Sequence, residues 1–229
     1  MSSRAERARG QLYGRRKGPK LRSAQADLLT SLLPALTVEP AQAHQPRTCF
    51  GVPVDDVWLE VGFGAGEHLY ALAQTNPHVG LIGAEPFVNG VAKLLSKLKD
   101  DVDIQQRVRI HMGDARDILA ALPGGSLSRV MVLFPDPWPK TRHHKRRFIQ
   151  MAILDAIAAA LRPGGQLRFA SDNPQYVAWT LERVLAHDAF FWAARRKQDW
   201  SIRPADWPSS RYEAKALCGP PCYFVFERR

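Results

Sequence analysis

Short apolar runs alternate with longer amphipathic stretches along most of the chain. The short runs predict buried strands, and the longer stretches, with apolar residues three or four positions apart, predict helices. The predicted strands are 57–61, 81–85, 108–111, 130–134, 167–171 and 223–227, and the predicted helices are 23–36, 67–74, 87–99, 115–122, 147–161 and 175–186. Residues 161–165, LRPGG, predict a helix stop and a turn. This alternation predicts βαβ units and a mainly parallel sheet.

Carboxylates recur where the predicted strands of the alternating region end. In an open parallel sheet, ligands bind at the carboxyl ends of the strands, so these side chains should gather at one edge. They are Glu60, Glu85, Asp114, Asp136 and Asp172. The pattern therefore predicts an acidic ligand site.

The turn after the first of these strands is rich in glycine. Gly62, Gly64 and Gly66 form G-x-G-x-G, which either lets the backbone approach a ligand or only makes a tight turn. A dinucleotide fingerprint would have glycine at position 67, where this chain has Glu67. The surrounding acids would repel a pyrophosphate but attract a cationic nucleoside. Glu85, which lies 23 residues beyond Gly62, is spaced to bind ribose hydroxyls. These features favour S-adenosylmethionine as the cofactor.

The segment FPDPWPKTRHHKRRF, residues 134–148, combines a stiff loop with a dense positive charge. Its three prolines exclude helix and central strand, which fixes Asp136 in an extended loop. Five cations follow within eight residues: Lys140, Arg142, Lys145, Arg146 and Arg147. The segment predicts an acidic site beside an anion-binding surface.

The net charge of +10 is concentrated in two places. Residues 1–22 carry a net charge of +7 and the loop 140–147 adds +5, which leaves −2 for the rest of the chain. Two such patches indicate a polyanionic partner, although each alone could be a solvated surface. A mitochondrial presequence is an alternative for residues 1–22, but Gly10, Gly14, Gly18 and Pro19 would break its helix. We expect a disordered arm over 1–22 and a single domain over 23–229.

Composition excludes several classes of protein. At 45% hydrophobic and 24% charged residues, the chain is typical of a soluble globular domain. No apolar run is long enough to cross a membrane. The three cysteines, Cys49, Cys218 and Cys222, cannot all pair and have no zinc-like spacing. A metal or disulfide at Cys218 and Cys222 is a weak alternative to a reduced, cytoplasmic protein without a metal.

Six motifs together resemble one enzyme family. LEVGFGAGEHL, GAEPF, GDA, FPDPWPKTRHHKRRF, ASDNPQY and SSRYEAKA, in this order and spacing, resemble the bacterial tRNA (guanine-N7-)-methyltransferases over about residues 20–227. The proline-rich segment 134–148, called the proline loop below, is the most specific of these motifs. The resemblance implies a Rossmann-like class I methyltransferase fold, with a doubly wound, mainly parallel seven-stranded sheet and helices on both faces. It also implies methyl transfer from S-adenosylmethionine to N7 of a guanosine in tRNA, at position 46 of the variable loop, by a monomer or homodimer.

The resemblance assigns roles to particular residues. Those implied for S-adenosylmethionine are Glu60, Gly62, Gly64, Gly66, Glu85, Asp114 and Asp136. Those implied for tRNA are Lys140, Asp172, Ser210, Arg211, Tyr212 and Glu213. Arg142, Lys145, Arg146 and Arg147 would run along the RNA backbone, which dominates affinity. Trp138 either stacks on a base or packs in the core. Pro86 and Ser210 depart from the residues usual in the family.

Guanine N7 is a lone pair without a proton, so its methylation needs alignment rather than a general base. Positive charge moves into the guanine ring, and nearby carboxylates favour that change. Asp136 and Asp172 are the catalytic candidates, although Asp172 could instead cap the helix near Gln175.

Two other functions compete with this one. Methyltransferases acting on exocyclic amines carry a related motif, D/N-P-P-aromatic, from which Pro135-Asp136-Pro137-Trp138 departs. A non-catalytic RNA-binding module on the same fold is the second alternative. Binding of S-adenosylmethionine would separate that module from either enzyme.

Overall fold

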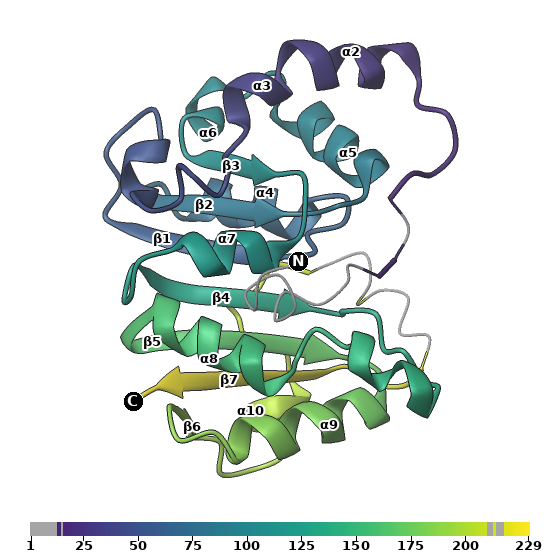
Figure 1. The fold of residues 1–229 in the computed structure, drawn as a ribbon, viewed down its shortest axis with the longest axis vertical. Helices are drawn as coiled ribbons and strands as arrows, with labels where there is room; N and C mark the ends of the chain where they lie inside the picture. The colour runs from purple at the N-terminus through teal and green to yellow at the C-terminus, as the bar shows by residue number, and fades with distance from the viewer. Residues whose placement is uncertain (1–12, 15, 210–212, 214–217) are drawn as a thin grey trace, which may run out of the picture.

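The computed structural model describes residues 13–14, 16–209, 213 and 218–229. A seven-stranded sheet lies between two layers of helices (Figure 1), in the order β3-β2-β1-β4-β5-β7-β6. The strands are β1 (Asp56–Val61), β2 (Val79–Ala84), β3 (Val108–His111), β4 (Leu127–Leu133), β5 (Leu161–Ser171), β6 (Phe190–Trp192) and β7 (Cys222–Arg228). β1 to β5 are parallel, whereas β7 runs antiparallel to β5 and β6. The predicted mainly parallel α/β fold is confirmed.

Helices cover both faces of the sheet (Figure 1). They are α2 (Ser23–Ser31), α3 (Leu33–Leu36), α4 (Glu67–Thr75), α5 (Val88–Leu98), α6 (Val102–Gln105), α7 (Ala115–Ala121), α8 (Met151–Ala160), α9 (Pro174–Leu185) and α10 (Gln198–Ser201), with 3-10 turns η1 (Pro46–Cys49) and η2 (Thr141–Arg146). Among the described residues, none of these helices is long and apolar enough to span a bilayer.

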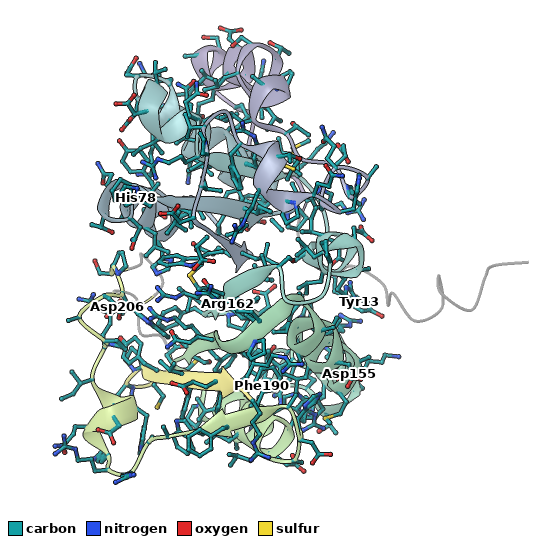
Figure 2. All side chains as sticks on the ribbon, turned by 90° about the vertical axis from the view of Figure 1, so that its left-hand side faces the viewer. Tyr13, His78, Asp155, Arg162, Phe190 and Asp206 are labelled. Atoms are coloured by element: carbon teal, nitrogen blue, oxygen red, sulfur yellow. The ribbon has the colours of Figure 1, made fainter. Side chains whose placement is uncertain are left out.

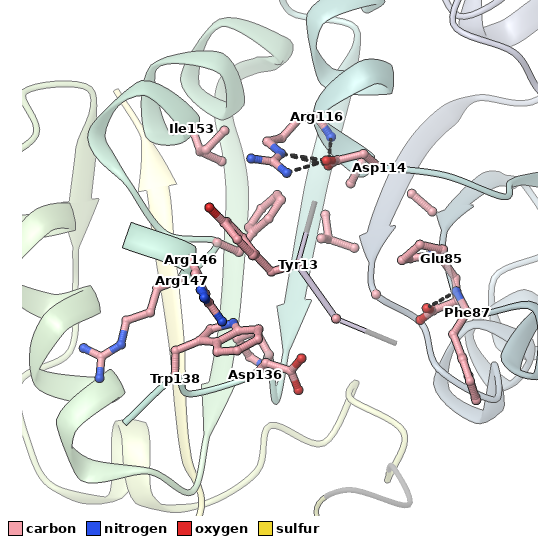
Figure 3. A pocket seen from close by; sticks show the side chains of 18 of the residues that line it. Tyr13, Glu85, Phe87, Asp114, Arg116, Asp136, Trp138, Arg146, Arg147 and Ile153 are labelled. Carbon is pink, nitrogen blue, oxygen red and sulfur yellow. Dashed lines mark hydrogen bonds and ion pairs between the residues drawn. The ribbon is translucent and has the colours of Figure 1, made fainter. Parts of the chain in front are cut away.

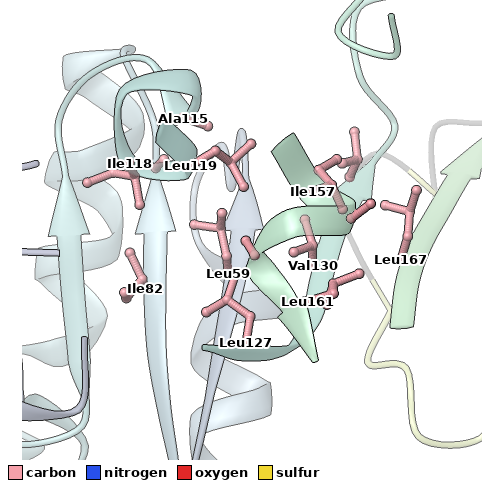
Figure 4. Packing of buried hydrophobic residues seen from close by; sticks show 14 of the residues in the cluster. Leu59, Ile82, Ala115, Ile118, Leu119, Leu127, Val130, Ile157, Leu161 and Leu167 are labelled. Atoms are coloured by element: carbon pink, nitrogen blue, oxygen red, sulfur yellow. The ribbon is translucent and has the colours of Figure 1, made fainter. Parts of the chain in front are cut away.

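Alternate strand residues point to opposite faces, which gives the core two large clusters, one on each face of the sheet, beside a small third one around Trp207. Leu59 and Val130 pack with α7 and α8 on one face (Figure 4). Trp58 and Met131, one position away along the same strands, pack with α4 and α5 on the other face. In Figure 2, Asp155 of α8 and Asp206 lie on opposite sides of the molecule. Because both faces are buried, the strands read as continuous apolar runs.

The connection order brings two loops together. β2 lies on one side of β1, and the chain then crosses over to place β4 on the other side. The glycine turn after β1 and the proline loop after β4 therefore meet where the strand order reverses, which is the usual ligand crevice of such sheets.

The structure corrects the predicted start of α8. The sequence predicted a helix from Arg147, but α8 begins at Met151. Ile149 explains the difference, because its N–H donates to the Tyr176 hydroxyl (3.2 Å) and its carbonyl accepts from the Trp179 indole (2.7 Å). Side chains of α9 thus replace the helical hydrogen bonds of this residue.

Other boundaries differ for local reasons. β5 begins at Leu161, directly after α8, and residues 162–165 form an irregularity opposite β4, with Gly164 at φ +75°. The turn predicted there is thus an interruption inside a strand. β6, α6 and α10 were not predicted, because elements of three or four residues have no readable apolar period.

Candidate active site

A cavity of about 550 Å³ opens at the carboxyl ends of β1, β2 and β4 (Figure 3). Several residues predicted for the site line it together: Gly62, Gly64, Glu85, Asp114, Asp136, Lys145 and Arg146. Trp138 lines it too, as do Tyr13 and Gly14 from the N-terminal arm. The volume is that of a small-ligand pocket.

The glycine turn leaves backbone open to the cavity. Gly62, Gly64 and Gly66 have φ of +67°, +59° and +73°, a region that favours glycine. A Cβ on Gly62 would meet no protein atom within 4 Å, so this glycine faces open space. Gly66 does not line the cavity; it caps α4, and a Cβ there would lie 2.6 Å from Leu94. Gly62 and Gly64 thus form a cradle that fits a ligand, whereas Gly66 serves the turn and helix packing.

Glu85 joins the end of β2 to the glycine turn. Its Oε2 accepts from the Gly64 N–H and its Oε1 from the Phe87 N–H, both at 2.8 Å. Burial raises the pKa of this carboxyl, against the lowering by these two hydrogen bonds, and the charges of Asp136 and Glu60 raise it further. Each oxygen retains a lone pair, so Glu85 is oriented to accept further hydrogen bonds.

Glu60 lies deeper than the cavity wall. It is buried, and its Oε2 lies 2.9 Å from Nδ1 of the equally buried His68 on α4. Glu60 is not among the residues that line the cavity. Direct ligand contact by Glu60 therefore remains a prediction, and His68 is a partner that the sequence did not reveal.

Asp114 lines the cavity but is already paired. It caps α7 by accepting from the Arg116 N–H (3.0 Å), and Arg116 Nε donates to both of its oxygens at 2.9 Å. The pair is drawn in Figure 3. Asp114 therefore has a fixed orientation and a neutralised charge, which suits a hydrogen-bond acceptor better than a partner for a cation.

The proline loop holds Asp136 at the mouth of the cavity. Phe134 and Trp138, on either side, have φ of +49° and +43°, which non-glycine residues rarely adopt. The Phe134 N–H donates to the Ala170 carbonyl of β5 (2.7 Å), which ties the loop to the sheet. Asp136 is an exposed residue, yet the surrounding cavity and arm partly desolvate its carboxylate, and this desolvation raises its pKa.

Arg147 departs from its predicted place on the RNA surface. It is 2% exposed, its Nε donates to the Pro137 carbonyl (2.9 Å), and its guanidinium lies over the rings of Tyr176 and Trp179. The ring faces and the carbonyl stabilise a buried cation. Arg147 thus fastens the proline loop to α9 instead of contacting solvent.

The remaining cations of the proline loop differ in their exposure to solvent. Lys140, Arg142 and Lys145 are exposed on η2 or next to it. Arg146 turns inward, with its guanidinium carbon 4.9 Å from the centre of the Trp138 ring. Trp138 is half-buried at the cavity and belongs to none of the three core clusters, which disfavours the alternative of core packing.

Asp172 does not cap α9. Asn173 is the cap, because its Oδ1 accepts from the Tyr176 N–H (3.0 Å). The Asp172 Oδ2 instead accepts from the Cys218 N–H (3.0 Å), which ties the end of β5 to the segment before β7. Asp172 does not line the cavity but follows a strand adjacent to β4.

The predicted RNA segment is described only in part. Ser210, Arg211 and Tyr212 lie outside the described residues. Glu213 accepts from the Tyr223 hydroxyl (2.7 Å) and pairs with Arg203 (2.9 Å), so its carboxylate is held against β7. Its predicted contact with RNA is not tested by these interactions.

Comparisons with known proteins point to one family. The family model described as "Putative methyltransferase" matches residues 55–218. The chain is 52% identical to a tRNA (guanine-N(7)-)-methyltransferase of Rhodospirillum rubrum, over 95% of this chain and 87% of that protein. It is 50% identical to a protein of the same name from Paramagnetospirillum magneticum, over 98% of this chain and 94% of that one.

Solved structures support the fold. The 16S rRNA methyltransferase KamB aligns with a TM-score of 0.55 at 17% identity, over 82% of this chain and 94% of that one. A 16S rRNA (adenine(1408)-N(1))-methyltransferase from Catenulisporales acidiphilia aligns with a TM-score of 0.53 at 15% identity, over 83% and 94%. At such identities the likeness shows a shared fold alone.

Proposed function

This chain belongs to the family of tRNA (guanine-N(7)-)-methyltransferases, and from that premise we propose that it transfers a methyl group from S-adenosylmethionine to N7 of a guanosine in tRNA. The observation that carries the proposal is one cavity lined by the acids Glu85, Asp114 and Asp136 together with cations of the proline loop, Lys145 and Arg146. The target we propose is position 46 of the variable loop. The enzyme would act in the cytoplasm, as a monomer or homodimer, with residues 23–229 as the catalytic domain.

The cofactor would be held by the acids and glycines of the cavity. When bound, S-adenosylmethionine supplies an electrophilic methyl group on a positively charged sulfur. Glu85 has free lone pairs for ribose hydroxyls, and Gly62 leaves room for close approach to the backbone. Asp114 is oriented to accept hydrogen bonds. Glu60, a buried residue of β1, would contribute its negative charge from beneath the cavity wall, and Gly66 would maintain the shape of the glycine turn.

The residues near the target base need not move a proton. N7 of guanine carries a lone pair and no hydrogen, so no side chain has to act as a base. The remaining tasks are to align the base and to offset the positive charge that it gains. Asp136, which has a raised pKa and a fixed loop, and Asp172, at the end of the adjacent strand, are the residues that we propose for the second task.

The direct test is the identity of the product. The full chain would be incubated with undermodified tRNA and labelled S-adenosylmethionine, and the labelled nucleoside identified after digestion. We expect 7-methylguanosine. A methylated exocyclic amine would place the chain among the alternative methyltransferases, and absence of any labelled nucleoside would contradict enzymatic function.

Glu85→Ala should weaken S-adenosylmethionine binding more than tenfold. Loss of two ribose hydrogen bonds costs about 1.5–3 kcal/mol, and the Gly64 N–H also loses its acceptor. Calorimetry without RNA would measure the change, with Glu39→Ala, an exposed acid outside the cavity, as the control. Unchanged affinity, or tight binding of NADH by the unaltered chain, would contradict the proposed cofactor.

Removing the exposed cations of the loop should weaken tRNA binding without removing the chemistry. Lys140, Arg142 and Lys145 replaced together by alanine should lower the slope of log affinity against log salt by roughly two to three units. The matched control replaces Arg195, Arg196 and Lys197, three exposed cations elsewhere, and removes the same charge. If both triple variants changed the slope equally, the loop would hold no special place on the RNA.

A further inference from the structure

The described part of the N-terminal arm is fixed to the start of α5. The Val88 N–H donates to the Arg16 carbonyl (3.0 Å), and the Gly18 N–H donates to Oδ1 of Asn89 (2.7 Å). Asn89 Nδ2 returns a hydrogen bond to the Pro19 carbonyl (2.8 Å). Val88 is the first residue of α5, so the arm satisfies an N–H that has no partner within the helix. The predicted disorder of residues 1–22 stays a prediction, but Arg16, Gly18 and Pro19 have hydrogen-bond partners in α5.

From this anchor the arm reaches the opposite wall of the cavity. Gly14 has a φ of +121°, in the region that favours glycine. A Cβ on Gly14 would lie 3.8 Å from Oδ2 of Asp136, so the arm backbone passes close to that carboxylate. Described residues of the arm therefore lie near both acids: Gly18 lies against Phe87, whose N–H donates to Glu85, and Gly14 lies near Asp136.

Tyr13 is held inside the cavity by two side chains of the proline loop. The guanidinium carbon of Arg146 lies 4.6 Å from the centre of the Tyr13 ring. The Trp138 ring meets Tyr13 edge-on, with 6.1 Å between their centres. Figure 3 shows Tyr13 between these residues and the Asp114–Arg116 pair. A cation over an aromatic ring and an edge-on ring pair are both favourable, so these two contacts stabilise the position of Tyr13.

The cavity is large enough for a small ligand although Tyr13 forms part of its wall. With Tyr13 as one of its walls, the cavity has a volume of about 550 Å³, which lies within the usual range for small-ligand pockets. Tyr13 therefore borders the space for a ligand instead of filling it. The sequence contains one signal for this, because Tyr13 is the only aromatic residue among residues 1–22.

We infer that Tyr13 is a binding residue of the cofactor pocket, contributed by the arm, and that the arm acts on cofactor affinity as well as on RNA. The inference rests on the proposed function. The ring covers apolar surface of the bound cofactor and slows its departure from the cavity. This role is separate from the positive charge of the arm, which any nearby RNA would attract.

The test is binding of S-adenosylhomocysteine to the full chain by calorimetry, without RNA. Tyr13→Ala should raise the dissociation constant about tenfold, the loss expected for one aromatic wall. Tyr13→Phe keeps the ring and should stay within about twofold of the unaltered chain. Asn89→Ala, which loosens the anchor, should raise the constant about threefold. Lys17→Ala removes a charge from the same arm and should leave it unchanged.

Each outcome decides between the two claims. Equal or tighter binding by Tyr13→Ala, with tRNA methylation intact in the unaltered chain, would overturn this inference alone; tighter binding would mean that Tyr13 obstructs the pocket. An effect of Lys17→Ala as large as that of Tyr13→Ala would also overturn it. No binding and no methylation by the unaltered chain would overturn the proposed function as well.

Discussion

The Asp136→Asn enzyme is expected to methylate tRNA about a hundredfold more slowly than the unaltered enzyme in a single turnover at saturating tRNA and cofactor. Asparagine keeps the shape of the side chain, and the loop is held independently through Phe134 and Arg147. The change therefore removes mainly a negative charge beside the place where positive charge moves. Because Asp136 is an exposed residue and asparagine has nearly the same shape, the melting temperature should stay close to that of the unaltered enzyme.

Two further measurements separate this role from general damage. Affinity for positively charged S-adenosylmethionine should fall more than affinity for neutral S-adenosylhomocysteine. Because the pKa of Asp136 is raised, its carboxylate takes up a proton at a higher pH than an ordinary aspartate does. As the pH is lowered through that region, the wild-type rate should decrease, whereas the rate of Asp136→Asn should not depend on pH there. Asp188→Asn, at an exposed position, is the control. A rate within threefold of wild type would remove Asp136 from the chemistry.

A comparable loss, about a hundredfold or more in single-turnover rate, is expected for Asp172→Asn. The carboxylate would accept hydrogen bonds from the ring N–H and the exocyclic amine of guanine, which adenine cannot match. An amide oxygen can still accept from the Cys218 N–H, so stability should be near normal. S-adenosylmethionine affinity should hardly change, since Asp172 does not line the cavity.

Asn173→Ala is the matched control for Asp172. It removes the cap of α9 and should lower stability by about 1 kcal/mol, with little effect on the rate. Turnover of Asp172→Asn within threefold of wild type would leave Asp172 only the structural tie to Cys218.

Apolar periodicity was enough to predict most of the sheet. The strand predicted over 108–111 is Val108–His111, and the strand ends supplied the acids that line the cavity. Prolines and positive charge located the loop that holds Asp136. These features are local, so a single sequence contains them.

What the sequence did not reveal depends on partners far along the chain. Arg147 reads as a surface cation, but its neighbours Tyr176 and Trp179 lie about thirty positions away and bury it. β6, of three residues, exists because it pairs with β7. Tyr13 reads as part of a disordered arm, because nothing near it indicates Arg146 as its neighbour.

The position of β7 has a consequence for how the protein is made. β7 follows β6 in the chain, yet it lies between β5 and β6 in the sheet. Synthesis runs from the N-terminus, so β5 and β6 are made before the strand that joins them. Until residues 222–228 have been made, β5 pairs only with β4, and β6 lacks the strand that it pairs with in the folded sheet. The sheet therefore closes in a late step, when β7 inserts between two strands that already exist.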